Sequence, residues 1–277
     1  NMIKLVIDST SEIGVEEAKD LGLTLIPMKV IFDDEEYLVG VNLTNEEFYQ
    51  KLAESKNLPK TTQINFTEYV DAVRPILDAG DQVFAMCLSS ELSGSFNNLK
   101  MAQSELGSDN FEIFDTLSVT FAYKALVLEA MKLIKSGVTL AELKSEMERL
   151  RAKLRLYAII DNVKYLIKGG RLSQGKGLMA TALKIKPIVA IENGKVEVIG
   201  KAVGFNIALK SFCKLIKNVD LSRTMFSGHA EAIDKAQKMI ETIKDTLGLN
   251  FDKLCEIGAV IGTHAGPGTV GVVYFEK

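Results

Sequence analysis

The chain has 277 residues, of which 47% are hydrophobic and 25% charged, enough apolar material for two ordinary domains. Its 33 lysines and arginines face 36 aspartates and glutamates, so no positive field attracts polyanions and we expect no nucleic-acid partner. No apolar stretch reaches the roughly 18 to 20 residues that span a bilayer, so stable membrane insertion is not expected, while transient membrane contact stays open.

The three cysteines, Cys87, Cys213 and Cys255, lie far apart, without CxxC spacing or neighbouring histidines. This pattern indicates reduced thiols in a cytoplasmic protein rather than a disulfide framework or a zinc site. We expect no metal and no cofactor. Asn1 and Met2 lead directly into a strand-like segment, so we interpret Asn1 as a cloning remnant and expect no signal peptide.

Residues 1–155 alternate short apolar runs with amphipathic patterns, which predicts a three-layer α/β/α domain with a parallel sheet. Thr44, followed by Glu46 and Glu47, is a typical helix start. The expected strands cover residues 4–7, 23–26, 29–32, 82–88 and 111–115. The expected helices cover residues 14–21, 44–55, 65–79, 95–106, 121–136 and 139–155.

Residues 156–277 predict a second α/β domain with a mixed sheet. Asn193-Gly194 between two alternating runs predicts a hairpin and therefore antiparallel pairing. The expected strands cover residues 156–160, 188–192, 196–199, 255–263 and 270–275, and the expected helices cover 204–217 and 230–247. A turn is expected through 168–171.

Five polar clusters interrupt the apolar pattern, each at the expected end of a strand or turn: residues 8–11, 61–63, 89–95, 169–173 and 262–268. Ligands of parallel sheets collect beyond the carboxyl ends of the strands. Hydroxyls and free N–H groups at 89–95 therefore predict a receptor for an anion such as a carboxylate or phosphate. For residues 8–11, capping of the next helix is as good an explanation as a ligand-binding role.

The residues alone leave several functions open. Neither GxGxxG nor GxxxxGK[ST] occurs in the required context, so we expect no ATP binding by this chain. A serine hydrolase would use Ser93 as nucleophile and His264 as base, although no GxSxG surrounds Ser93. A third possibility is a subunit that binds a small phosphorylated or carbonyl ligand. His229 is better explained as a surface or capping residue.

Two further side chains have alternative roles. Arg171 either pairs with a carboxylate or phosphate or contacts a partner. His264, in an expected glycine-rich loop between two strands, either donates to an anion or bonds to backbone. The apolar residues near Arg171 are expected to be mostly core, with some lining a ligand tunnel: Leu178, Met179, Leu183, Ile185, Ile188, Val189 and Ile191.

Six motifs in a fixed order extend over essentially the whole chain: DSTSE at 8–12, TTQ at 61–63, SSELSGS at 89–95, DTLS at 115–118, GGRLS at 169–173 and IGTHAGPGTVG at 261–271. Together they resemble the DegV family of bacterial fatty-acid-binding proteins, which includes the carrier subunit of the fatty acid kinase system.

The resemblance implies a two-domain, non-enzymatic protein that holds one long-chain fatty acid, its carboxylate at the domain interface and its acyl chain in an apolar tunnel. Thr61 and Ser93 would bind the carboxylate, and the Gly94 N–H would be a further donor. Thr62, Arg171 and His264 would support the residues that bind the ligand, or would face a partner protein. A separate ATP-dependent fatty acid kinase would phosphorylate the presented carboxylate to an acyl phosphate for phospholipid synthesis.

The chain departs from the family pattern in two places. The TSQPS-like motif is Thr61-Thr62-Gln63-Ile64-Asn65 here, without the usual Pro and second Ser. After Asp115, residues 118–123 are bulkier than the Gly-containing stretch of the family. We expect these larger side chains to shorten the tunnel or change the preferred acyl chain.

Overall fold

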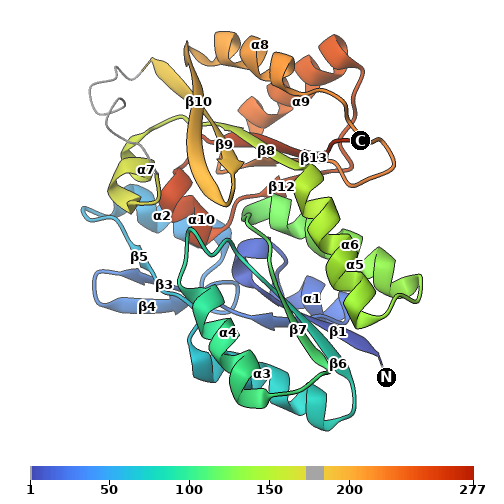
Figure 1. The fold of residues 1–277 in the computed structure, drawn as a ribbon. Helices are drawn as coiled ribbons and strands as arrows, with labels where there is room; N and C mark the ends of the chain where they lie inside the picture. The colour runs from blue at the N-terminus through green and yellow to red at the C-terminus, as the bar shows by residue number, and fades with distance from the viewer. Residues whose placement is uncertain (1, 173–183) are drawn as a thin grey trace.

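A computed structural model describes residues 2–172 and 184–277. Its first half contains a parallel four-stranded sheet of order β2-β1-β6-β7 (Figure 1). Helices α3 and α4 pack together on one side of this sheet, and α5 and α6 lie on the other. The strands are β1 (Ile3–Asp8), β2 (Thr24–Ile26), β6 (Gln82–Cys87) and β7 (Phe111–Asp115). The helices are α1 (Val15–Leu21), α2 (Asn45–Glu54), α3 (Phe66–Asp78), α4 (Ser95–Leu106), α5 (Thr120–Lys135) and α6 (Leu140–Lys153).

Local polar signals set the starts of three of these helices. Thr44 accepts the Glu47 N–H at 3.1 Å, and the Glu47 carboxylate accepts the Thr44 N–H in return. The same capping box begins α3 at Asn65 and α6 at Thr139. These caps explain why the predicted helix positions agree closely with the observed ones.

The second half is a mixed six-stranded sheet of order β10-β9-β8-β13-β11-β12, with α8 and α9 on its outer face (Figure 1). The predicted α/β fold class is therefore confirmed. The strands are β8 (Leu154–Ile159), β9 (Ile185–Glu192), β10 (Lys195–Val203), β11 (Phe226–His229), β12 (Lys253–Glu256) and β13 (Val270–Phe275). The helices are α7 (Lys164–Gly169), α8 (Phe205–Leu215), α9 (Ile233–Leu247) and α10 (Ala259–Ala265).

The predicted hairpin at Asn193-Gly194 is confirmed. β9 and β10 pair antiparallel, with Lys195 opposite Glu192. Asn193 has φ 51° and Gly194 φ 82°, the positive angles that a two-residue hairpin turn requires. The domain boundary at residue 155/156 stays a prediction, because the largest buried cluster joins side chains from both halves, among them Phe121 and Phe275.

One predicted strand belongs to a different sheet. Residues 29–32 were expected beside the parallel strands, but β3 (Lys29–Phe32) lies in a small antiparallel sheet of order β4-β3-β5. Asp33, with φ 52°, lies in the turn that leads directly into β4 (Glu35–Leu38). Val30 also faces Thr61 of β5 (Lys60–Thr61), so this sheet positions a predicted site residue.

The prediction was wrong for residues 255–263. The chain forms β12 only to Glu256, and residues 259–265 form helix α10. A short apolar run fits a buried helix as well as a strand, and periodicity cannot separate the two. The turn expected at 168–171 also begins later, because α7 continues to Gly169.

His229 was expected at the surface or as a cap; the first expectation is wrong, and the His229 side chain bonds to the residue before α9, not to an N–H within the helix. It lies in the unpredicted strand β11 and is buried. Its Nδ1 accepts the N–H of Ala232 at 3.0 Å, immediately before α9. Helix α9 begins at Ile233, not at residue 230 as predicted.

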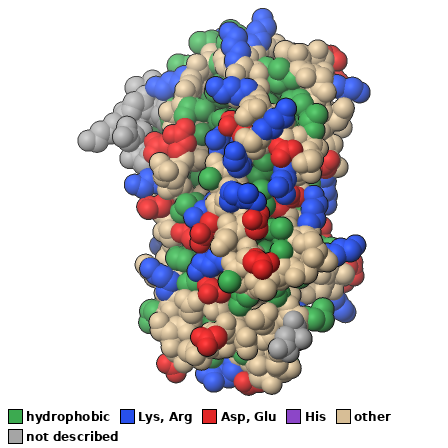
Figure 2. All heavy atoms as spheres, turned by 45° about the vertical axis from the view of Figure 1, so that its right-hand side comes forward, with side chains coloured by type: hydrophobic (Ala, Val, Ile, Leu, Met, Phe, Trp, Pro, Cys, Tyr) green, Lys and Arg blue, Asp and Glu red, His purple; other side chains and the backbone are tan. Residues whose placement is uncertain are grey.

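Charges of both signs alternate over the face seen in Figure 2, without a large area of one sign. This agrees with the near balance of acidic and basic residues in the sequence. Within residues 2–172 and 184–277, no helix combines the length and apolar character needed to cross a membrane.

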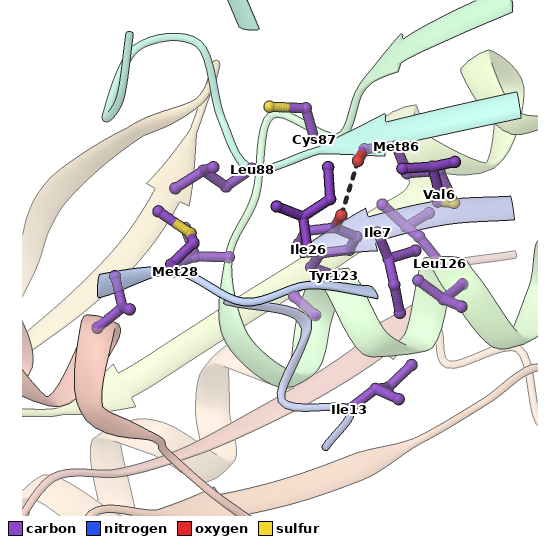
Figure 3. Close-up of a cluster of buried hydrophobic side chains, with 14 of the residues drawn as sticks. Val6, Ile7, Ile13, Ile26, Met28, Met86, Cys87, Leu88, Tyr123 and Leu126 are labelled. Atoms are coloured by element: carbon purple, nitrogen blue, oxygen red, sulfur yellow. Dashed lines mark hydrogen bonds between the residues drawn. The ribbon is translucent and has the colours of Figure 1, made fainter. Parts of the chain in front are cut away.

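Tyr123 fixes the start of α5 against the parallel sheet (Figure 3). Its hydroxyl donates to the Met86 carbonyl at 2.8 Å. Around it Val6, Ile7 and Leu126 are fully buried. This anchoring places the residues just before Tyr123, at the first turn of α5, between the two main sheets.

Candidate functional site

A cavity of about 440 Å³ lies between the two halves of the chain, within the range typical of small-molecule sites. All six residues predicted for the site line it: Thr61, Thr62, Ser93, Gly94, Arg171 and His264. Most of the remaining lining is apolar and comes from both halves, including Met28, Leu88, Phe121, Leu156, Val189, Ile191 and Val260. The cavity thus combines a set of hydroxyl groups with an extended apolar wall.

Thr61 and His264 form a pair in this cavity. Thr61 Oγ1 lies 3.1 Å from His264 Nε2, although 203 positions separate the two residues. β5 supplies the threonine and α10 supplies the histidine. When Nε2 carries the proton it donates to Oγ1, which leaves the threonine hydroxyl proton free to point at a ligand.

Burial, with the charge of Arg171 as a smaller cause, lowers the pKa of His264 to about 4. The imidazole is therefore neutral at physiological pH. Its Nδ1 is buried and has no hydrogen-bond partner among the described residues. A Cβ on Gly169 would lie 2.5 Å from Nδ1, so a glycine there leaves room for the ring.

Ser93 is held within a chain of hydroxyl groups. Its Oγ lies 2.9 Å from Ser95 Oγ and accepts the Ser95 N–H at 3.1 Å. Ser95 Oγ in turn accepts the Ile64 N–H at 2.9 Å. These bonds tie the segment after Thr61 to the loop that carries Ser93, so the two predicted anchors have a fixed relative position.

Gly94 precedes α4, whose first N–H groups carry partial positive charge. A Cβ at Gly94 would lie 2.0 Å from the Gln63 Oε1, so a larger residue there would force the Gln63 side chain to move. Arg171 is exposed and donates to the Gly169 carbonyl at 2.7 Å. Thr62 contributes its N–H to the Lys29 carbonyl at 3.3 Å.

The two departures from the family pattern have clear local consequences. Asn65 caps α3, and Asn98 Nδ2 donates to the Ile64 carbonyl at 2.8 Å, so the loop after Thr61 is held without the usual proline. Val119, Thr120 and Phe121 all line the cavity. The bulkier stretch therefore does contribute to the cavity wall.

Some apolar residues near Arg171 line the cavity and others are core, as expected. Val189 and Ile191 face the cavity, whereas Ile188 packs in the buried cluster that includes Phe212. Alternating side chains on β9 point to opposite faces, which accounts for the division. Ser173, Leu178, Met179 and Leu183 lie outside the described residues.

Ser89 connects the two halves beside the cavity. It is fully buried, and its hydroxyl donates to the Gly194 carbonyl at the hairpin tip at 2.7 Å. Its own carbonyl accepts the N–H of Ser93 at 3.2 Å. One residue therefore supports both the Ser93 loop and the β9–β10 hairpin.

Replacing Ser89 with Ala is expected to lower the free energy of unfolding by about 1–3 kcal/mol, because the buried Gly194 carbonyl loses its donor. Urea denaturation measures the change. Ser90→Ala is the matched control, since that neighbouring side chain is exposed and a change within about 0.5 kcal/mol is expected. Equal stability of the two variants would contradict the assignment.

Glu12 is a partly buried acid that sequence analysis named only as part of a motif. Its Oε2 accepts the Thr120 hydroxyl at 2.6 Å and the Gly258 N–H at 3.0 Å. Burial raises the pKa of Glu12 to about 8, more than these two bonds lower it. Burial likewise raises the pKa of Asp8 to about 6.

The raised pKa of Glu12 predicts that the protein loses stability as pH rises from 6.5 to 8. The folded state holds a proton that an unfolded glutamate has already released above pH about 4.5, so unfolding becomes easier through the folded pKa. The loss is at most about 2 kcal/mol, one proton over 1.5 pH units. Chemical denaturation at several pH values should show this slope in the wild type and in Glu16→Gln, but not in Glu12→Gln.

The arrangement does not join Ser93 and His264 as nucleophile and base. Ser93 pairs with Ser95 and His264 with Thr61, and within the described part of the chain no hydrogen bond links the two. The same part of the chain contains no group of three or more His, Cys, Asp or Glu residues placed to hold a metal ion.

Three polar cavity residues were not proposed for the site from the sequence: Gln63, Thr120 and Thr269. Gln63 stood within a motif that was noted. Thr269 likewise lies in the motif at 261–271, and Thr120 lies in the bulkier stretch at 118–123. Neither was singled out, because their positions in the cavity depend on how α5 and β13 meet the rest of the fold.

A family model described as an uncharacterised protein of the DegV family matches residues 2–277. A DegV domain-containing protein from Clostridium acetobutylicum is 31% identical over 284 residues, with 99% of each chain covered. A solved structure of a fatty acid binding DegV family protein from Streptococcus agalactiae is 26% identical, covers 100% of both chains and has a TM-score of 0.92. A solved structure from Bacillus subtilis, described as DegV, a fatty acid binding protein, is 29% identical, covers 100% of this chain and 99% of its own, and has a TM-score of 0.85.

Proposed function

The chain belongs to the DegV family, and from that premise we propose that it binds one long-chain fatty acid in the cavity between its two halves. The hydroxyls of Thr61 and Ser93 and the N–H of Gly94 hold the carboxylate, and the apolar wall holds the acyl chain. The observation that carries the proposal is the presence of Thr61, Ser93 and His264 in an otherwise largely apolar cavity. The relatives from Streptococcus agalactiae and Bacillus subtilis, both described as fatty acid binding, support it.

Physical chemistry favours this division of roles. A carboxylate loses its water on burial, which is costly unless donors replace it. Each buried methylene contributes roughly 0.8 kcal/mol, so a long acyl chain supplies most of the affinity. The hydroxyl groups then fix the orientation of the chain in the cavity.

We further propose that the protein is a carrier in the cytoplasm. A separate ATP-dependent fatty acid kinase phosphorylates the presented carboxylate, and the acyl phosphate enters phospholipid synthesis. Arg171 supports presentation, since it lines the cavity and is also exposed. In this proposal the domains are residues 1–155 and 156–277, and the carboxylate lies at their interface.

Native mass spectrometry of the purified protein tests lipid binding. The expected result is one fatty acid per chain, and delipidated protein should take up palmitate or oleate in a calorimetric titration. Absence of bound lipid together with no uptake would reject the proposal.

A chromogenic acyl ester distinguishes the carrier from a hydrolase. Turnover by the wild type that disappears in Ser93→Ala would favour the hydrolase. Lipid uptake without turnover would favour the carrier. Adding an ATP-dependent fatty acid kinase should then yield acyl phosphate only when the loaded protein is present.

A further inference from the structure

Glu12 and Thr120 are bonded to each other in conformations that neither residue prefers. Glu12 has φ 60° and Thr120 has φ 55°, and positive φ is unfavourable for a β-branched side chain. Such conformations cost free energy, persist only where the surroundings enforce them, and cluster at functional sites. Their hydrogen bond, 2.6 Å long, joins the end of the DSTSE motif to the first residue of α5.

The oxygen that accepts from Thr120 also accepts the Gly258 N–H, at 3.0 Å. Gly258 is the N-cap residue of α10, immediately before Ala259. A Cβ at this position would lie 2.7 Å from Glu12 Oε1, so the close approach requires glycine. One carboxyl group thus connects three segments that are far apart in the sequence.

Both donors belong to elements that build the cavity. Thr120 lines it directly, as does the adjacent Phe121. Gly258 leads into the helix whose Val260, Ile261 and His264 also line the cavity. A shift of the Glu12 carboxyl would therefore move a wall residue and the histidine that pairs with Thr61.

The other charged and titratable groups around Glu12 have hydrogen-bond partners of their own. Lys124 of α5 pairs with Glu17 at 3.0 Å, and Asp8 accepts from Thr10. Tyr49 of α2 donates to the Ile257 carbonyl at 2.6 Å. Since Tyr49 anchors the residue before Gly258, a variant at Glu12 keeps one attachment of this segment to the first half.

We propose that Glu12 is a positioning residue of the lipid site: its Oε2 atom sets Thr120 in the cavity wall and, through Gly258, the helix that carries His264. The inference rests on the proposed lipid binding for its affinity readout. What matters is the position of an acceptor oxygen, not the charge of the side chain.

Two substitutions separate position from charge. Glu12→Gln keeps an acceptor oxygen at the same distance but cannot ionise. Glu12→Asp keeps the acid, tolerates positive φ, and retracts the carboxyl by one bond, about 1.5 Å. Glu16→Asp is the matched control, because Glu16 is an exposed acid four residues away. Each variant is first checked for folding by circular dichroism and compared well below its melting temperature.

The readouts are palmitate affinity and the ring resonances of His264 in lipid-free protein, assigned with a His264→Gln variant. We expect Glu12→Gln and Glu16→Asp to bind within about twofold of the wild type and to leave the His264 signals in place. Glu12→Asp should weaken binding about tenfold or more, the loss of roughly one buried hydrogen bond, and should shift the His264 signals.

Two results would overturn the inference. One is that Glu12→Gln weakens palmitate binding as strongly as Glu12→Asp does. The other is that Glu12→Asp changes neither the palmitate affinity nor the His264 signals. If the wild type binds no palmitate, the proposed function fails instead. The His264 signals of lipid-free protein then still decide whether Glu12 positions the helix. Should Glu12→Asp not fold, Gly258→Ala, which crowds the same carboxyl, replaces it and should shift the same signals.

Discussion

Replacing Ser93 with Ala, or Thr61 with Val, should weaken fatty acid binding by about 10- to 150-fold each. A hydrogen bond to a charged group contributes roughly 1.5–3 kcal/mol, and the buried carboxylate would lose one donor in each variant. Thr61 ends β5 and Ser93 lies on the loop before α4, and hydrogen bonds through Ser95 to Ile64 join the two segments. Both hydroxyls therefore have fixed positions relative to the ligand. Titration of delipidated protein with palmitate measures the affinities.

The control for this prediction lies in the same loop. Ser90 is exposed, and Ser90→Ala should bind as the wild type does. Because Ser93 also accepts the Ser95 N–H, the melting temperature of Ser93→Ala is recorded to separate loss of fold from loss of binding. Identical affinities for Ser93→Ala and Ser90→Ala would remove Ser93 from the proposed site.

Phe121→Ala should have the largest effect on stability, a loss of about 3–5 kcal/mol for a buried aromatic ring. The ring lines the cavity and also fills the space over two glycines: a Cβ at Gly228 would lie 2.2 Å from it and one at Gly271 3.2 Å. Removing the ring enlarges the cavity, so the variant should admit longer or bulkier acyl chains. Denaturation and mass spectrometry of the co-purified lipid measure the two effects.

A second-site test checks this contact. Gly228→Ala alone should destabilise the protein, because the new methyl group meets the Phe121 ring. Combined with Phe121→Ala, the same substitution should cost much less, since the ring is gone. Purely additive losses, or an unchanged set of bound lipids in Phe121→Ala, would show that Phe121 does not limit the cavity.

The sequence predicted the helices of the first half well, because their starts carry local signals. Thr44 and Thr139 are followed by acids at the capping-box position, and Asn65 caps α3 in the same way. The Asn193-Gly194 hairpin was equally clear, since its positive φ angles limit the residue types. Prediction failed at residues 255–263, where an apolar run has no local feature that separates a buried helix from a strand.

The sequence predicted which residues belong to the candidate site, but not which hydrogen bonds join them. The motifs placed Thr61, Ser93, Gly94 and His264 together through resemblance to a family. Nothing in them indicated that His264 pairs with Thr61, that Ser89 holds the hairpin tip, or that Glu12 joins α5 to α10. Each of these contacts joins residues more than one hundred positions apart.

The sequence by itself determined what depends on neighbouring residues: helix caps, the hairpin turn, the alternation of buried and exposed positions and the clustering of hydroxyls at strand ends. Only the tertiary structure decided which sheet β3 joins, that residues 259–265 form a helix and which side chains share the cavity. The reason is physical. Burial and long-range hydrogen bonds select among local conformations of similar energy, and that selection depends on partners distant in the sequence.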